Sequence, residues 1–330
     1  MGKAVQGMHE ITNHTHPQYR YLHIDIAKGI GILAVIGLHT GFHVPAWVGW
    51  EMPLFFLISG IFANPHKKDF IISRINRLLV PACFFYAPIF LYNCAFYLIN
   101  QGDISLYDCF MDCAIPSALW FLIALFYISI FHFIVSQFIN KKIWLVTIAI
   151  ISFTIGYLLY NWQIPQLLFI NTSITSFFFY LIGNIYCEKL KSLSLINKWF
   201  SGLLGCIMLI SSWAIYTYSD SYIFYRNNEL NADAHIIITV ALLGIIGILL
   251  ISVSLTYIKF ISIILNYFGK NSLVILCTHL YYLKLIQYFH FTTIMQFGIV
   301  TICMIPTIYI LKHYFPKLSG FQPLFKLKMK

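Results

Sequence analysis

The stretch HIIITVALLGIIGILLISVSLTY, residues 235–257, contains no aspartate, glutamate, lysine or arginine. The hydrocarbon layer of a bilayer is about 30 Å thick, and a helix that rises about 1.5 Å per residue needs about 20 apolar residues to cross it. Apolar residues follow one another here without the alternation of a half-buried strand. Because backbone polar groups in lipid must be paired internally, this stretch predicts a transmembrane helix and excludes a strand of a membrane barrel.

The composition extends this interpretation to the whole chain. Apolar residues make up 60% of the 330 residues and charged residues 10%, whereas soluble domains carry about 25% charged residues. No linker or internal repeat divides the sequence. We therefore predict an all-α integral membrane protein with about ten transmembrane helices. The expected spans are residues 24–42, 46–64, 78–99, 114–138, 143–161, 167–187, 199–218, 235–257, 271–289 and 292–311.

The basic residues predict how these spans are oriented. If the N-terminus is cytoplasmic, all but three of the 21 lysines and arginines fall on the cytoplasmic side, as the positive-inside rule requires. The exceptions are Lys28 and Lys284, within spans, and Arg226, in an outer loop. Both termini are therefore expected to be cytoplasmic. The expected parts are a polar N-terminal tail at 1–23, a ten-helix membrane domain at 24–312 and a basic C-terminal tail at 313–330.

The same data argue against two kinds of ligand. The net charge of +10 is dispersed between apolar runs, so it does not form the basic patch typical of nucleic-acid binding. The cysteines lack zinc-site spacing, and His39 with His43 offers too few ligands for a metal site. We expect neither nucleic acid nor a metal cofactor.

The first span carries three ionisable residues, Asp25, Lys28 and His39. Such residues are expensive in lipid and commonly mark function. At about 100° per residue, the steps from Lys28 to His39 return to within about 20° of one direction, with a rise of about 16 Å. The three side chains are expected to share a helix face that leads from a cytoplasmic cation to an imidazole near the outer side. An ion pair at the start of the helix and a core histidine are the structural alternatives.

Six segments occur in a specific order along the chain. They are DIAKGIGILAVIGLHT (25–40), EMPLFFLISGIF (51–62), RINRLLVP (74–81), ALWFLIALF (118–126), YRNNELNADAHIIITVALLGIIGILLIS (225–252) and FGKNSLVILCTHL (268–280). In this order and spacing they resemble acyltransferase family 3, ten-span membrane enzymes that O-acetylate sugars of capsules, lipopolysaccharide and other glycans. The chain is most similar to fucose 4-O-acetyltransferase and related acetyltransferases.

The resemblance implies roles for particular residues. Lys28 and His39 match the family's pattern of a basic residue, ten intervening residues and histidine, with lysine in place of the usual arginine. The family histidine is implicated in catalysis, which carries over to His39, with Lys28 and Asp25 beside it on the span. The family's RxxR pattern carries over to Arg74 and Arg77. Lysine keeps the charge of arginine but loses its two-pronged geometry.

The chemistry of acyl transfer suits these residue types. Transfer from a thioester to a hydroxyl needs a base near neutral pH, for which imidazole is well suited. His39 is expected either to deprotonate the hydroxyl or to carry the acyl group covalently. Arg74 and Arg77, with Lys68 nearby, are expected to bind the phosphates of acetyl-coenzyme A through charge-assisted hydrogen bonds. The alternative is that these three cations bind no ligand and only follow the positive-inside rule of membrane topology.

Candidates for the acceptor site lie on the outer side. They are Glu51, Trp120, Arg226, Asn228 and His279. Glu51 stands where many relatives have histidine, and a solvated interfacial acid is its alternative role. Trp120 is expected to stack on a sugar or to pack in the core, and His279 is expected to be buried in a catalytic or structural role. Arg226 and Asn228 share a polar outer loop in which a glycan would be met.

The sequence thus predicts a multi-pass O-acyltransferase of a bacterial inner membrane. It would use cytoplasmic acetyl-coenzyme A and acetylate a sugar hydroxyl of a surface polysaccharide or its lipid-linked precursor, and membrane lipid would surround it. The oligomeric state is left open, with a homo-oligomer compatible. One alternative is a glycan transporter with Asp25, Lys28 and His39 as a proton relay. Another is an inactive relative that acts as an assembly scaffold.

Overall fold

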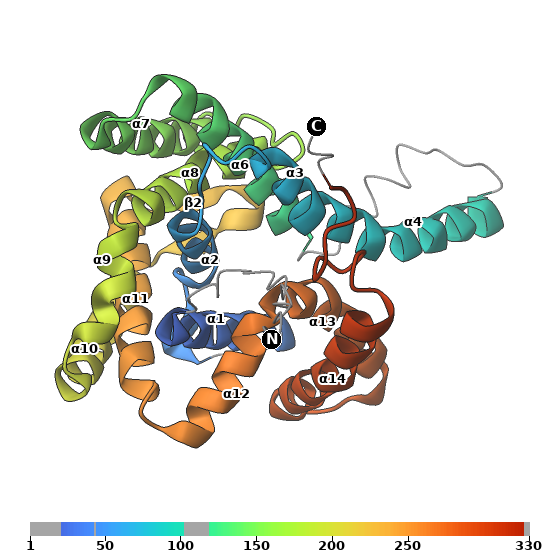
Figure 1. The fold of residues 1–330 in the computed structure, drawn as a ribbon. Coiled ribbons are helices and arrows are strands. Elements are labelled where there is room, and N and C mark those ends of the chain that lie inside the picture. The colour runs from blue at the N-terminus through green and yellow to red at the C-terminus, as the bar shows by residue number, and fades with distance from the viewer. Residues whose placement is uncertain (1–20, 43, 102–118, 327–330) are drawn as a thin grey trace, which may run out of the picture.

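The structure is a computed structural model and describes residues 21–42, 44–101 and 119–326. It is almost entirely helical, with one small hairpin (Figure 1). The first half contains α1 (Leu22–Thr40), η1 (Pro45–Trp47), α2 (Glu51–Ile61), α3 (Phe70–Arg74), the π-helix η2 (Ile75–Leu79), α4 (Val80–Gln101), α6 (Trp120–Phe138) and α7 (Lys142–Asn161). The second half contains α8 (Ile170–Ile185), α9 (Cys187–Lys191), η3 (Ser192–Leu195), α10 (Lys198–Tyr218), β1 (Tyr222–Phe224), η4 (Tyr225–Asn227), β2 (Glu229–Asn231), α11 (Ala234–Leu255), α12 (Lys259–Lys270), α13 (Ser272–Ile286), η5 (Gln287–Phe289) and α14 (Thr293–Tyr314).

Seven helices in the described ranges are long and apolar enough to cross a membrane, or eight if a bent pair counts as one span. The seven are α1, the continuous helix Phe70–Asn100, α6, α7, α10, α11 and α14. The bent pair is α12 with α13, whose axes differ by 82°. The expected class of an all-α membrane protein is confirmed. The count of ten stays a prediction, because α2 has 11 residues and α8 has 16.

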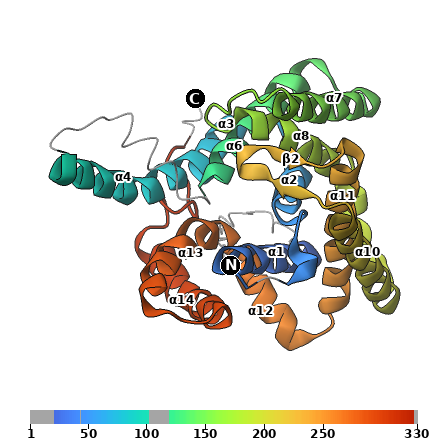
Figure 2. The same cartoon turned by 180° about the vertical axis from the view of Figure 1, so that it is seen from behind.

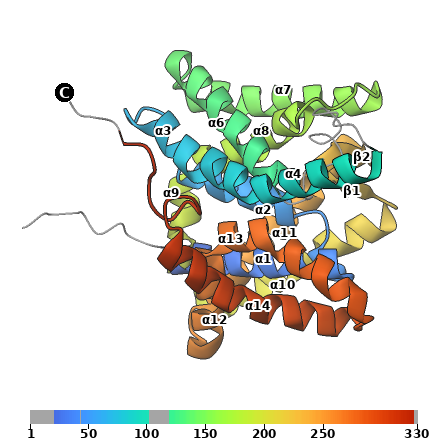
Figure 3. The same ribbon diagram turned by 90° about the vertical axis from the view of Figure 1, so that its right-hand side faces the viewer.

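The first helix lies in the interior of the bundle. α1 packs against α2, α11, α12, α13 and α14, and the view from behind shows it enclosed by these helices (Figure 2). Seen from the side, α7 and α14 run in roughly one direction, as spans of one bilayer would (Figure 3). α4 projects away from the other helices in Figures 1 and 2. The central position of α1 places its ionisable residues inside the protein.

Two helix contacts are so close that they require glycine. A Cβ atom added at Gly60 on α2 would overlap the backbone carbonyl of Tyr180 on α8, and one at Gly183 would overlap the carbonyl of Leu57. Gly29 on α1 and Gly269 on α12 form a second pair of this kind, because a Cβ atom added at either would overlap a backbone carbonyl of the other helix. Small residues of this kind let helices in lipid approach closely and pack by van der Waals contact. They fix α2 and α12 against the core of the bundle.

The segment between α10 and α11 forms an antiparallel hairpin, with Ile223 opposite Leu230. Its turn is closed by Asn228 at φ +56°, a left-handed conformation that asparagine tolerates better than most residues. Tyr225 and Asn228 are buried, so the hairpin folds back onto the bundle.

The C-terminal segment returns to the π-helix that follows Arg74. The Asn76 side chain donates to the carbonyl of Phe325 at 2.8 Å and accepts from the backbone N–H groups of Leu324 and Phe325, both at 2.8 Å. The Phe315 ring lies 5.6 Å from that of Phe84. The described part of the expected C-terminal tail is therefore attached to the membrane domain.

Candidate active site

A cavity of about 490 Å³ opens between α1, α3, the π-helix, α6 and the break between α12 and α13. Its cationic lining residues are Lys28, Lys67, Arg74, Arg77 and Lys270, and its described lining contains no acidic residue. Asp25 pairs with Lys28 at 2.5 Å, and Asp69 pairs with Lys67 at 3.1 Å. Three further cations remain in the lining, so we define this space as the cationic cavity and expect it to attract an anionic ligand.

The local structure around Arg74 and Arg77 explains their position. Arg74 ends α3 and Arg77 lies in the π-helix, a conformation that is rare and often found at functional sites. Arg74 stacks over the Phe70 ring at 5.0 Å, while Asn76 between the arginines holds the C-terminal segment. The chain therefore presents both arginines to the same cavity.

The composition of the cavity differs from the expected donor set. Lys68 is exposed and is not among the lining residues, whereas its neighbour Lys67 is. Lys270 lies at the break between α12 and α13 and was not expected there. Lys28 was expected to act with the catalytic histidine, but it lines the cavity, about 16 Å of helix rise before His39. Lys28 thus lines the cationic cavity, Asp25 is paired with it, and their expected catalytic role beside His39 stays a prediction.

His39 lies beside His279, and the centroids of their rings are 5.2 Å apart. His279 is 1% exposed, and its Nδ1 lies 2.9 Å from the carbonyl of Ile275 one turn earlier on α13. A carbonyl only accepts hydrogen bonds, so Nδ1 carries the hydrogen and Nε2 carries the lone pair. Nε2 is buried without a hydrogen-bond partner in the part of the chain that the structure describes. This leaves a basic nitrogen next to the half-buried ring of His39.

Further polar groups lie on the hairpin and at the start of α2. Arg226, on the hairpin, is near enough to His39 for their charges to interact. Glu51 interacts electrostatically with Tyr225, and its carboxyl group lies against backbone N–H groups at the start of α2. Within the described ranges, Glu51 Oε2 and the Tyr225 hydroxyl are buried without hydrogen-bond partners. Buried polar atoms are normally satisfied, so two unpartnered oxygens in one region are unusual and make it a candidate for binding polar groups. We define His39, His279, Glu51, Tyr225 and Arg226 as the outer polar cluster, named for the side of the membrane on which the sequence predicts them.

Two other acceptor candidates have packing roles. Trp120 is 5% exposed, and its ring lies 6.3 Å from Phe56 and 6.4 Å from Phe169. The amide of Asn228 is engaged at both ends, donating to the Gly156 carbonyl at 2.9 Å and accepting from the Thr175 hydroxyl at 2.6 Å. Both side chains hold parts of the bundle together, and Asn228 also lines a small cavity of about 190 Å³.

The cationic cavity and the outer polar cluster follow one another along α1 and α13. Ile32 on α1 and Leu276 on α13 line the cavity. Leu276 precedes His279 by three residues, a rise of about 4.5 Å, and Ile32 precedes His39 by about 10 Å. The cavity thus extends to within one helical turn of His279. An extended ligand with its anionic end at Arg74 and Arg77 would point its other end toward the histidines.

Comparison with known protein families agrees with this arrangement. The acyltransferase 3 family model, described as an acyltransferase domain, matches residues 21–313. The chain belongs to this family and is a multi-pass membrane acyltransferase. No curated protein and no solved structure gives a match.

Proposed function

We propose that the chain transfers an acetyl group from cytoplasmic acetyl-coenzyme A to a sugar hydroxyl of a surface polysaccharide or its lipid-linked precursor. One observation supports this most directly. The cationic cavity and the histidine pair lie at successive levels along the same two helices, α1 and α13. An acyl-coenzyme A has matching chemistry, because its phosphates and its thioester lie at opposite ends of a long, thin arm.

The donor end of the reaction is assigned to the cationic cavity. Arg74 and Arg77 bind the phosphates by charge-assisted hydrogen bonds, and Lys28 and Lys270 add positive charge. The apolar residues beyond them, among them Ile32 and Leu276, surround the uncharged part of the arm. Binding in this direction carries the thioester toward His39.

The acceptor end is assigned to the outer polar cluster. Glu51 and Tyr225 bind sugar hydroxyls, and Arg226 lies across from His39. In a direct transfer, His39 removes the proton of the attacking hydroxyl, the oxygen bonds to the thioester carbonyl, and the departing thiolate takes up that proton. In a two-step transfer, the His39 nitrogen first replaces the thiol at the carbonyl. The sugar hydroxyl then displaces the imidazole from the acyl group, and the lone pair of His279 Nε2 takes up the proton of that hydroxyl.

The alternative of a proton-coupled transporter lacks a continuous polar path on α1. Every residue from Gly29 to Leu38 is apolar or glycine, so no side chain of this helix bridges Lys28 and His39. Asp25 is moreover paired directly with Lys28. Both facts fit two separate sites better than one relay.

Glycan analysis of a deletion strain tests the proposed function. We expect surface polymer of normal amount and length that has lost its acetyl esters, with the esters restored by the wild-type gene. Polymer that fails to reach the surface would instead indicate a transporter. Unchanged acetylation would contradict the proposal.

The proposed orientation places both termini and the segment around Lys68 in the cytoplasm. Single cysteines at Lys68 and at Asp220 on a cysteine-free background separate the two sides, since both positions lie between helices. A membrane-impermeant thiol reagent added to intact cells should label residue 220 and leave residue 68 unlabelled until the membrane is opened. Labelling of residue 68 in intact cells would reverse the orientation and the donor site with it.

A further inference from the structure

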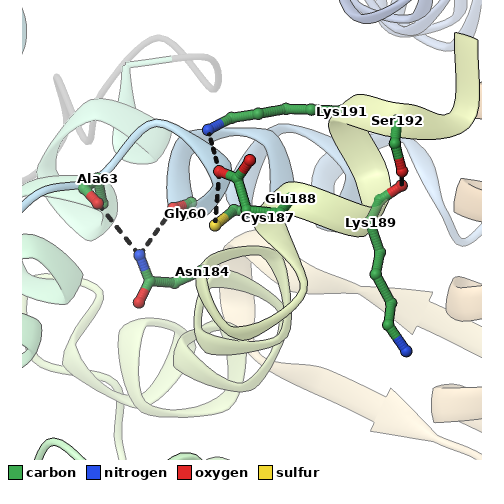
Figure 4. A network of polar contacts seen from close by, with 8 residues as sticks. All are labelled: Gly60, Ala63, Asn184, Cys187, Glu188, Lys189, Lys191 and Ser192. Atoms are coloured by element: carbon green, nitrogen blue, oxygen red, sulfur yellow. Dashed lines mark hydrogen bonds and ion pairs between the residues drawn. The ribbon is translucent and has the colours of Figure 1, made fainter.

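A second cavity, of about 680 Å³, lies between the end of α6, the start of α7 and the α8–α9 junction. Apart from Asn64, its lining residues differ from those of the cationic cavity. Its basic lining residues are His66, His132, Lys142 and Lys189. Glu188 is the acidic residue among the described lining, and Lys191 neutralises it at 2.8 Å (Figure 4). The balance of charge in this second cavity is therefore positive.

His132 gives this cavity a preformed polar group. Its side chain is 2% exposed, and its Nδ1 has no hydrogen-bond partner among the residues that the structure describes. The charges of Arg74 and His66 are close enough to interact with it. Buried polar atoms are rarely left unsatisfied without a reason, and a ligand oxygen in the cavity would supply the missing partner.

The start of α7 adds backbone donors to the same site. Lys142 is the first residue of this 20-residue helix, and the preceding Lys141 makes no side-chain cap to it. The uncapped N–H groups and the helix dipole favour an anion at this end. The α8 wall of the cavity includes Asn184, which donates to the carbonyls of Gly60 and Ala63 at 3.2 and 3.1 Å (Figure 4). That wall is thereby fixed in place by contacts between α8 and the end of α2.

The exposed apolar surface beside the cavity indicates which kind of anion would bind there. Ile143, which lines the cavity, is 67% exposed, and the adjacent Trp144 is 57% exposed. In a membrane protein such apolar surface contacts lipid, and tryptophan beside lysine marks the level of the lipid headgroups. The site is thus open to the bilayer at the depth where phosphates of lipids lie. Basic recesses between membrane helices are known to hold anionic headgroups.

We propose that the second cavity binds the phosphate headgroup of an anionic phospholipid, with its acyl chains along the exposed start of α7. Lys142, Lys189 and the α7 N-terminus contact the phosphate, and His132 donates to or accepts from the headgroup. This cavity adjoins the cationic cavity at Asn64, but the proposal does not depend on the proposed acyl transfer.

Lipid binding to the full-length protein in detergent tests the proposal. Phosphatidylglycerol and phosphatidylcholine are titrated separately, and bound lipid is counted by native mass spectrometry. The test variant is Lys142→Gln with Lys189→Gln. The control variant is Lys141→Gln with Lys259→Gln, which removes the same charge from exposed lysines outside the cavity. Thermal unfolding without added lipid confirms that each variant is folded.

We expect phosphatidylglycerol to bind the wild type and the control at least tenfold more tightly than phosphatidylcholine. The test variant should lose about fivefold in affinity for each lysine removed. Equal losses in the two variants would assign the effect to diffuse surface charge and overturn the proposal. Equal binding of the two lipids would also overturn it. Displacement of the lipid by free glycerol phosphate at similar concentration would show a soluble phosphate site instead.

Discussion

Replacement of His39 by alanine should reduce acetyl transfer by about 10²- to 10⁴-fold, the range typical for loss of a positioned general base. His39 lies 5.2 Å from His279 between ring centroids, with the cationic cavity ending one turn away on α13. His39→Gln should fail as well, because an amide offers hydrogen bonds but no basic nitrogen. The measurement is transfer from acetyl-coenzyme A to a glycan acceptor by purified protein, together with its thermal unfolding.

His235→Ala is the matched control, since this imidazole is exposed at the start of α11. It should leave transfer unchanged. If His39→Ala keeps even a third of wild-type transfer at normal stability, His39 is not the catalyst. Radiolabelled acetyl-coenzyme A without acceptor separates the two routes. Label retained on the wild type and lost in His39→Ala would indicate a covalent acyl carrier, and no retained label would indicate a general base.

Replacement of both Arg74 and Arg77 by alanine should raise the KM for acetyl-coenzyme A by tenfold or more. Each charge-assisted hydrogen bond is worth about 1.5–3 kcal/mol, and both arginines line the cationic cavity. Since neither reaches the histidine pair, kcat at saturating donor should change much less than KM. Arg77→Ala alone, which leaves the Arg74–Phe70 contact intact, should give part of the same shift.

The control for this pair is Lys68→Ala with Lys141→Ala. Both lysines are exposed and lie outside the described lining of the cavity, so the control removes equal charge without touching the proposed donor site. Its KM should match the wild type. If both double variants raise KM equally, the cations act only through the general field at the membrane surface. If neither double variant raises KM, the two arginines only help to orient the protein in the membrane.

Helix positions were predictable from the sequence because lipid imposes one simple rule. A run such as 235–257 has to be helical once it is in the membrane, and α11 occupies it. Span length and helix contacts were harder to predict. α2 has 11 residues, where a span of 46–64 was expected. Its glycine contact with α8 depends on the backbone of a helix more than a hundred residues away.

The site was predictable to a smaller extent. Residues near one another in the sequence, such as Arg74 and Arg77, were placed together by their spacing alone. Lys270 was missed because the 82° break between α12 and α13 brings it to the cavity. For Trp120 the sequence left sugar stacking and core packing open, and for Asn228 it favoured the acceptor, because polarity and aromaticity do not distinguish a ligand contact from a packing contact. Only the partners of the two side chains do so.

The apolar end of the cationic cavity has a consequence for the electrical state of the membrane. Ile32, Leu276, Phe55 and Phe121 form an apolar part of the lining beside the cations, and the rings of the last two are 6.1 Å apart. A hydrated ion would lose its water in this layer, at a cost of several kcal/mol for a charged group. The arm of an acyl-coenzyme A is uncharged between its phosphates and its acyl group, so it pays no such cost. Under the proposed function, such a layer would let an acyl group pass but would oppose the leakage of ions, so the voltage across the membrane would be preserved during turnover.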